Sequence, residues 1–492
     1  MVEAFRSGER SPREELEATL AAVERTDLNC FSHVDPERAL AAIDRADVSL
    51  PFGGVPVGIK ELDAVRGWPD TGGSLVFRDR VAAETQTSVR RLVERGGAVP
   101  VGLTTSSEFG GLNVSVTKLN GTTHNPWGRG RTAGGSSGGS GAAVAGGLVP
   151  LCTAADGGGS IRIPAAFNGL FGLKGTYGRV PRGPHAYSRP STEVFGCLAR
   201  SVRDTARYYD VCAGADPQDP WSLPSNGGWE AALGTHELRG RKMGLVPDLG
   251  GVVLADGVEA HVRASAEALA DATGMEMVDL QIDTPNLASE WMMSNVSTLM
   301  AELGDRWPRC GKDLTHAIDD GLRLSQTLYN LRTAAAFERK RLRLNDAMAA
   351  AFEQVDFVVA ATNDGPPFAA DAEMSNPPSV ILDQVMKHPV SRALVAALLA
   401  LARAVGGVFP GFPSLLLEQV ASRVPELVNM GALTIVSNLY GNPAASIPSG
   451  LLDGMPLGMQ VLARHHDDAL LLDLGLAAER EIGWPMIAPQ AC

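Results

Sequence analysis

Two serines and a lysine have the types and spacing to form a nucleophilic centre. Ser136 lies in the glycine-rich run Gly134–Gly141, and Ser160 follows three consecutive glycines 24 residues later. Lys60 ends an apolar run, Val55–Ile59, upstream of both serines. In such a set an uncharged lysine serves as base, one serine relays a proton, and the other attacks a carbonyl carbon. The spacing therefore indicates acyl transfer that needs no histidine.

The glycines before Ser160 favour this serine as the nucleophile. They leave backbone N–H groups uncovered at the point where the oxygen of a tetrahedral intermediate would develop negative charge. We expect the oxyanion hole to consist of the N–H groups of Gly157, Gly158, Gly159 and Ser160. A phosphate-binding loop is the rival interpretation of such glycines, but it requires GxxxxGK[ST] or a GxGxxG after a strand, and neither pattern occurs.

Lys60 can act as a base only when it is uncharged. Burial must then lower its pKa from about 10.4. The apolar residues before it fit that requirement, whereas the neighbouring carboxylates Glu61 and Asp63 would oppose it if they faced the ammonium group. Strand alternation places Glu61 on the opposite face. Ser137, beside Ser136, is expected to have a backbone or capping role.

Further motifs accompany these residues along nearly the whole chain. They are Thr104–Gly110, Asn125–Trp127, Asp156–Gly175 and Asn438–Gln460. With them the chain resembles the amidase signature enzymes, which are Ser-Ser-Lys hydrolases of carboxylic amides. The resemblance implies that Ser160 is the nucleophile, Lys60 the base, and Ser136 the relay, with a cis peptide bond between Gly135 and Ser136. Departures from the family pattern, such as Glu61 and Gly157, leave these three residues intact.

Two charged residues near Ser160 are expected to support its loop. Arg162 should pair with a carboxylate and fix the loop in place, and Asp156 should have a similar structural role with Lys174 as partner.

The order of elements predicts an α/β fold. Strands over Val55–Ile59 and Ala98–Leu103 flank a helix over Thr87–Arg95, which argues for a mixed sheet core covered by helices on both faces. Motifs spread from residue 59 to residue 460 favour a single large domain over 1–492. Within it we expect an N-terminal helical segment (1–50), a catalytic core (55–180) and, by resemblance, a variable helical region carrying the substrate pocket (285–430).

Composition narrows the class of partner and ligand. A net charge of −13 makes nucleic acid and anionic membranes poor partners. The six cysteines are scattered without metal-ligand spacing, so we expect free thiols, no metal and no cofactor.

The N-terminus lacks an apolar signal segment, which favours a cytoplasmic protein. The longest apolar run, Ala393–Ala402, is too short to span a bilayer and predicts a buried or pocket-lining helix. The sequence leaves open whether the protein forms a homodimer.

The sequence thus predicts an amidase acting on a small linear amide whose acyl group is uncharged and partly apolar. One alternative is the glutaminase subunit of a transamidation complex, which supplies ammonia to a partner. Such a subunit needs an arginine for the α-carboxylate of glutamine, and the candidates are Arg332, Arg339, Arg341 and Arg343. The other alternative is a catalytically silent relative, which the intact serines and lysine argue against.

Overall fold

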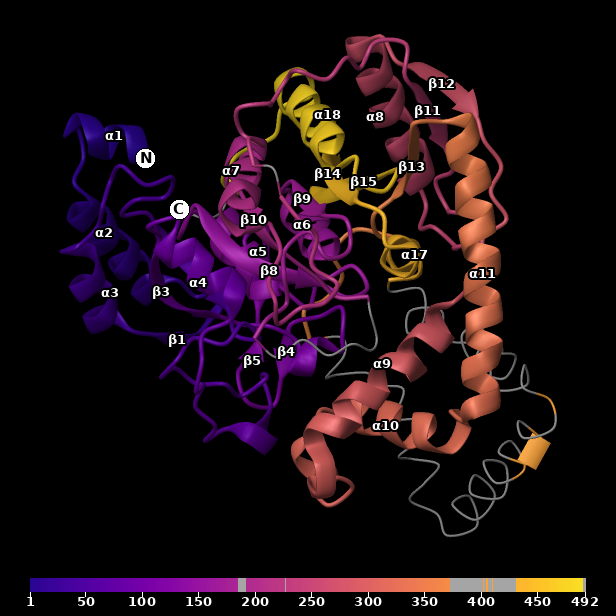
Figure 1. Cartoon of the computed structure of the whole chain (residues 1–492), viewed down its shortest axis with the longest axis horizontal. Coiled ribbons are helices and arrows are strands. Elements are labelled where there is room, and N and C mark those ends of the chain that lie inside the picture. Colours follow the sequence, from indigo (N-terminus) through magenta and orange to yellow (C-terminus); the bar gives the residue numbers. More distant parts are fainter. Residues whose placement is uncertain are drawn as a thin grey trace.

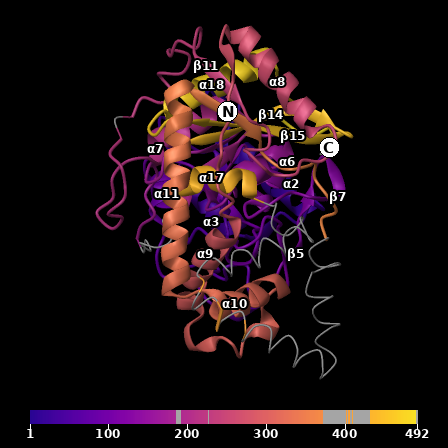
Figure 2. The same ribbon diagram turned by 90° about the vertical axis from the view of Figure 1, so that its right-hand side faces the viewer.

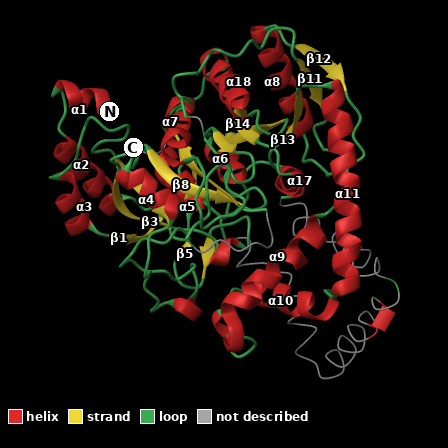
Figure 3. Cartoon of the chain, viewed as in Figure 1, coloured by secondary structure: helices red, strands yellow, loops and turns green. Residues whose placement is uncertain are grey.

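The computed structural model describes residues 1–184, 192–225, 227–371, 401, 404–405, 409 and 431–489. In this part of the chain most strands belong to two sheets (Figures 1 and 3). The first has the order β1 (Phe31–Val34), β3 (Val99–Thr104), β2 (Pro56–Lys60), β8 (Leu151–Asp156) and β10 (Val194–Ala199). The second has the order β12 (Glu276–Asp279), β11 (Lys242–Leu245), β13 (Phe357–Ala361), β15 (Met455–Ala463), β14 (Ala444–Leu452) and β9 (Gly172–Lys174).

A bridge between Phe171 and Ala199 connects the edges of the two sheets, so that they run on from one another. Both contain parallel and antiparallel neighbours: β2 is parallel to β3 and β8, whereas β10 is antiparallel to β8. The mixed sheet predicted from the sequence is confirmed. Two short hairpin pairs, β4 (Val116–Thr117) with β5 (Gly121–Thr122) and β6 (His124–Asn125) with β7 (Gly128–Thr132), lie outside these sheets.

Helices cover both faces of the sheets, as predicted (Figure 3). The alternation along β8 shows this directly, because Leu151 and Ala155 belong to one apolar cluster while Cys152 and Ala154 belong to another. The helices are α1 (Val2–Ser7), α2 (Pro12–Arg25), α3 (Pro36–Ile43), α4 (Thr87–Glu94), α5 (Gly138–Ala145), α6 (Arg162–Asn168), α7 (Val202–Cys212), α8 (Val258–Thr273), α9 (Ala288–Leu303), α10 (His316–Leu328), α11 (Leu331–Gln354), α17 (Ala432–Tyr440) and α18 (Asp468–Glu481).

Local signals account for several helix boundaries. Ser11 and Glu14 form a capping box at the start of α2. The helical region over residues 287–352 is interrupted at Gly304 and Gly311. A further break lies before α11, where the side chain of Asn330 accepts hydrogen bonds from the N–H groups of Arg332 and Thr333.

The helices α9, α10 and α11 form one end of the molecule. Figure 1 shows α11 running along the edge of the fold from the second sheet to α10, and the turned view in Figure 2 shows it from the outside. Of the apolar run Ala393–Ala402 only Leu401 is described, so the prediction for this run lies outside the described residues. Among the described helices, none combines the length and apolar character that a bilayer crossing requires.

Candidate active site

A cavity of about 400 Å³ brings Lys60, Ser136 and Ser160 together. Lys60 is the last residue of β2, Ser136 lies in the turn before α5, and Ser160 lies in the turn between β8 and α6. The parallel strands β2 and β8 are neighbours, so their carboxyl ends deliver the lysine and the Ser160 turn to the same edge of the sheet.

The lysine and Ser136 are in direct contact. Lys60 Nζ donates a hydrogen bond to Ser136 Oγ over 2.8 Å, and Lys60 is only 1% exposed. The peptide bond between Gly135 and Ser136 is cis, as the resemblance implied. A Cβ on Gly135 would lie 2.5 Å from the backbone nitrogen of Val114, so only glycine allows this turn to pack so closely. Ser160 lines the same cavity, but within the described residues no hydrogen bond joins its hydroxyl to Ser136.

Burial lowers the pKa of Lys60 below its ordinary value, and the negative charges of Asp63 and Glu193 oppose this shift. Asp63 is itself buried, which raises its own pKa to about 6. Glu61 accepts hydrogen bonds from the backbone N–H of Ser106 and from Asn120, so its carboxylate is bound to other groups. The net direction of the Lys60 shift is the one that a neutral base requires.

The glycine turn before Ser160 differs from expectation at one amide. The N–H of Gly159 donates to Asp156 Oδ1 over 2.7 Å and therefore does not point to a substrate. Gly159 has a φ of +128°, a backbone conformation that favours glycine. In the described part of the chain the N–H groups of Gly157, Gly158 and Ser160 donate to no protein acceptor. The expected set of four donors is thus reduced to three.

Behind this turn lies a fully buried ion pair. Arg162 Nη2 and Nε contact the two carboxylate oxygens of Asp156 at 2.9 and 3.0 Å. Burial alone would raise the pKa of Asp156, but the charge and hydrogen bonds of Arg162 outweigh burial and hold the pKa below its usual range. The remaining Arg162 donors are bound to groups on α17 and β15, namely the Thr434 carbonyl, Ser437, Asn438 and Gln460.

Lys174 is not the direct partner of Asp156 that the sequence suggested. Its ammonium group donates to the backbone carbonyls of Gly175 and Asn442, at 3.2 and 2.6 Å. The partner is Arg162 because its forked guanidinium can bind both carboxylate oxygens at once. Burial lowers the pKa of Lys174 to about 7. Ser137 takes the first of the two roles expected for it, a backbone role rather than a capping one, since its hydroxyl bonds the backbone of Ala155 on β8.

Sequence reasoning missed Trp291, which comes from α9 and packs on the glycine turn. Its indole N–H donates to the carbonyl of Gly157 over 2.9 Å. α9 and α10 form one wall of the cavity, with Met292, Val296, Leu299 and Ile318 among the apolar lining residues. A tryptophan in an amphipathic helix carries no motif, so nothing in the sequence distinguished it from a core residue.

The arginines proposed for a substrate carboxylate lie elsewhere. Arg332, Arg339, Arg341 and Arg343 are on α11, and none is among the described residues that line the cavity. No group of three or more His, Cys, Asp or Glu side chains suited to a metal ion occurs among the described residues.

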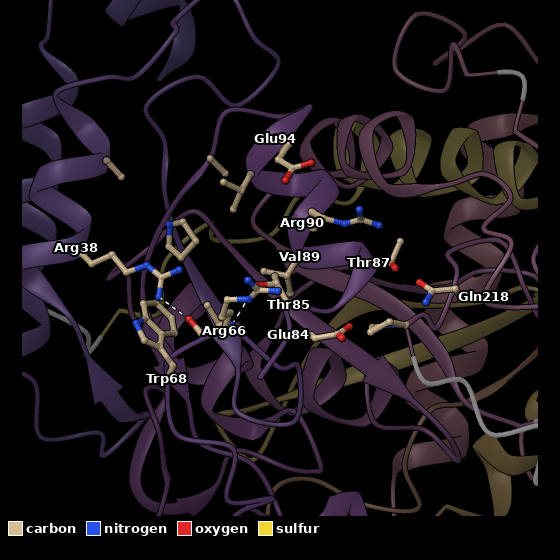
Figure 4. A pocket seen from close by; sticks show the side chains of 16 residues that line it. Arg38, Arg66, Trp68, Glu84, Thr85, Thr87, Val89, Arg90, Glu94 and Gln218 are labelled. Carbon is tan, nitrogen blue, oxygen red and sulfur yellow. Dashed lines mark hydrogen bonds between the residues drawn. The ribbon is translucent and has the colours of Figure 1, made fainter. Parts of the chain in front are cut away.

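A second cavity of about 540 Å³ lies at α3 and α4 and contains none of Lys60, Ser136 and Ser160 (Figure 4). There the guanidinium of Arg38 lies over the ring of Trp68 and donates to the carbonyl of Arg66. Size alone would favour this cavity, but it lacks a nucleophile with a base beside it.

Known proteins share both the sequence pattern and the fold. The family model described as Amidase matches residues 14–413. A component of the glutamyl-tRNA(Gln) amidotransferase of Ralstonia nicotianae is 30% identical, over 96% of this chain and 94% of that protein.

Two solved structures superpose over 100% of this chain. A 6-aminohexanoate cyclic dimer hydrolase complexed with substrate is 25% identical with a TM-score of 0.81, and 98% of that chain is covered. A bacterial aryl acylamidase is 24% identical with a TM-score of 0.82; 97% of that chain is covered, and the likeness shows the fold alone. The extent of the family match and of the relative's coverage leads to one conclusion: this chain belongs to the amidase signature family, enzymes that act on carbon–nitrogen bonds.

Proposed function

We propose that this protein hydrolyses a small linear carboxylic amide through Ser160, Ser136 and Lys60. The observation that supports this most is the 2.8 Å hydrogen bond between Lys60 and Ser136 in the cavity that Ser160 also lines. A lysine this deeply buried, with a lowered pKa and a hydroxyl as its polar partner, is suited to accept a proton.

In the proposed reaction Ser160 Oγ attacks the amide carbonyl carbon and passes its proton to Ser136, whose own proton goes to Lys60. The N–H groups of Gly157, Gly158 and Ser160 stabilise the oxyanion. As the C–N bond breaks, the protonated lysine returns a proton through Ser136 to the departing nitrogen. Water then attacks the acyl-enzyme by the same relay and releases the carboxylate.

The region 285–430 is proposed to select the substrate, because the helices α9 and α10 within it supply one wall of the cavity. Its apolar side chains would contact the carbon skeleton of the amide.

A glutaminase subunit is the second candidate, favoured by the 30% identity to one component of a glutamyl-tRNA(Gln) amidotransferase. Among the described residues that line the cavity, two are arginines and both contact carboxylates: Arg80 pairs with Asp70 and Glu302, and Arg182 pairs with Asp219. Neither is therefore placed as an uncommitted partner for the α-carboxylate of glutamine, which favours a stand-alone amidase.

The test is the release of carboxylate from a panel of primary and N-substituted amides, with glutamine included. We expect hydrolysis of several amides, little hydrolysis of glutamine, and loss of activity in Ser160→Ala. Ser137→Ala is the matched control, because among the described residues the hydroxyl of Ser137 bonds backbone groups of β8 and none of the proposed catalytic residues. Hydrolysis of glutamine alone, rising with a co-purified partner, would favour the second candidate instead.

A further inference from the structure

One carboxylate in the catalytic cavity has no role in the proposed reaction. Glu193 lines this cavity, immediately before β10. Because Val194 pairs with Asp156 in antiparallel register, Glu193 lies across from Gly157, the first residue of the turn that leads to Ser160. A Cβ built on Gly157 would be 4.0 Å from the Cβ of Glu193. Glu193 is thus a direct neighbour of the proposed oxyanion hole.

The two arginines among the described lining residues of the cavity each form ion pairs with carboxylates. Arg80 contacts Asp70 over 2.9 Å and Glu302 over 3.0 Å. Arg182 contacts Asp219 over 2.9 Å. Within the described part of the chain Glu193 has neither a hydrogen bond nor an ion pair, and its side chain is exposed to the cavity. With Lys60 uncharged, acidic groups outnumber basic groups among the described residues that line the cavity.

The carboxylate of Glu193 is open to the cavity and has no counter-ion among the described residues. Desolvation by the surrounding protein raises the pKa of Glu193, and the charges of Lys60 and Arg182 oppose this shift. The mechanism requires Lys60 to be uncharged when it acts as base, which removes one of these two stabilising charges. A cationic group brought by a ligand would replace it.

We propose that the substrate is an amide carrying an ammonium group near the scissile bond, and that Glu193 binds this group. The inference rests on the proposed amidase function and names its substrate class. It departs from the uncharged acyl group expected from composition, because the charges of Glu193, Asp70 and Glu302 meet only in the folded chain.

The first experiment compares kcat/KM for two amide series. One series is primary amides whose acyl chain ends in an ammonium, a methyl or a carboxylate group. The other is N-alkyl acetamides with the same three end groups on the amine side. A hydrogen-bonded charge pair corresponds to roughly 10- to 100-fold. We expect the wild type to prefer the ammonium member by this factor in at least one series.

The variant Glu193→Gln keeps the size of the side chain and removes its charge. It should lose the preference for the ammonium member and hydrolyse the methyl member as the wild type does. Glu94→Gln, an exposed glutamate at the other cavity, is the matched control and should leave both rates unchanged. An equal loss on all members in Glu193→Gln, or a wild type without preference in both series, would overturn the proposal.

A second readout separates this inference from the proposed function. A fluorophosphonate labels an activated serine whatever the natural substrate is, so labelling of Ser160 reports on the proposed function alone. Butylammonium should slow labelling of the wild type more than butanol does, and should lose this advantage in Glu193→Gln. Labelling that proceeds normally with equal protection by both compounds would contradict the role of Glu193 and leave the amidase function standing.

Discussion

Lys60 and Arg162 are both deeply buried basic residues at the same site, but their surroundings differ. Arg162 is bound by the carboxylate of Asp156 and by four further acceptors from α17 and β15. The ammonium group of Lys60 has one hydrogen-bond partner among the described residues, the hydroxyl of Ser136. The arginine is therefore stabilised as a cation, whereas burial destabilises the cationic form of the lysine.

The two residues therefore differ in role: Arg162 supports the site, whereas Lys60 is proposed to take part in the reaction. The Arg162 ion pair fixes the glycine turn through Asp156, which accepts the N–H groups of Gly159 and Ile161. Lys60 has no direct counter-ion among the described residues, and in the proposed reaction its lone pair accepts a proton. We therefore expect a substitution of Lys60 to lower activity without lowering stability. A substitution that breaks the Arg162 ion pair should instead lower stability.

The largest effect is expected from Lys60→Met. Removing the base should lower kcat/KM for amide hydrolysis by about 10²- to 10⁴-fold, the usual contribution of general acid–base catalysis. The free energy of unfolding should stay unchanged or rise, because methionine removes a buried amine whose charged form is unfavourable. Steady-state kinetics and urea unfolding measure the two quantities. A Lys60→Met protein that keeps its activity would contradict the proposed difference in role between Lys60 and Arg162.

Asp156→Asn should show the reverse signature. It leaves the buried Arg162 charge without its carboxylate, so we expect the free energy of unfolding to fall by about 3–5 kcal/mol. The pH dependence gives an independent check. The pKa of Asp156 is lowered by folding, so its stabilising contribution is present above about pH 4. That contribution should disappear as the pH falls through the lower folded pKa, and Asp156→Asn should lack this acid-dependent part.

A smaller effect is expected from the contact between α9 and the glycine turn. In Gly158→Ala the new Cβ would be 2.6 Å from the ring of Trp291, so the indole must move and its bond to Gly157 must change. Overpacking of this kind corresponds to about 1–3 kcal/mol. We expect kcat to fall. The matched control is Gly157→Ala, whose Cβ meets no atom closer than 4.0 Å and should have a smaller effect.

The pH dependence of activity should be the smallest but most specific signature. In the proposed reaction the neutral lysine is the base, so the rate should rise with pH as Lys60 loses its proton. Burial lowers the pKa of Lys60, so this rise should occur below its ordinary value of about 10.4. Lys60→Met should lack the rise. A wild-type rate that is flat from pH 6 to 10 would contradict a titrating base.

The sequence motifs predicted the proposed catalytic residues but not the residues that surround them in the fold. Lys60, Ser136 and Ser160 lie in motifs with fixed spacing, and the structure brings them to one cavity. Partners such as Gln460 and Trp291 are single residues far away in the chain, and only the packing of β15 and α9 reveals them.

The same reason explains the two differences at Asp156. Its pairing with Arg162 rather than Lys174, and its bond to the Gly159 amide, depend on side-chain and backbone directions in a tight turn. Spacing does not encode those directions. The charge of the cavity was missed because Glu193, Asp70 and Glu302 come from three distant segments.

The most direct test of Ser160 as an activated nucleophile is intact-mass spectrometry after incubation with a small fluorophosphonate. Wild type, Ser160→Ala and Ser137→Ala should be compared under identical conditions, with folding checked by circular dichroism. We expect a single adduct on the wild type and on Ser137→Ala, and none on Ser160→Ala. An adduct that persists in Ser160→Ala, or a folded wild type that takes up no label, would contradict the assignment of Ser160.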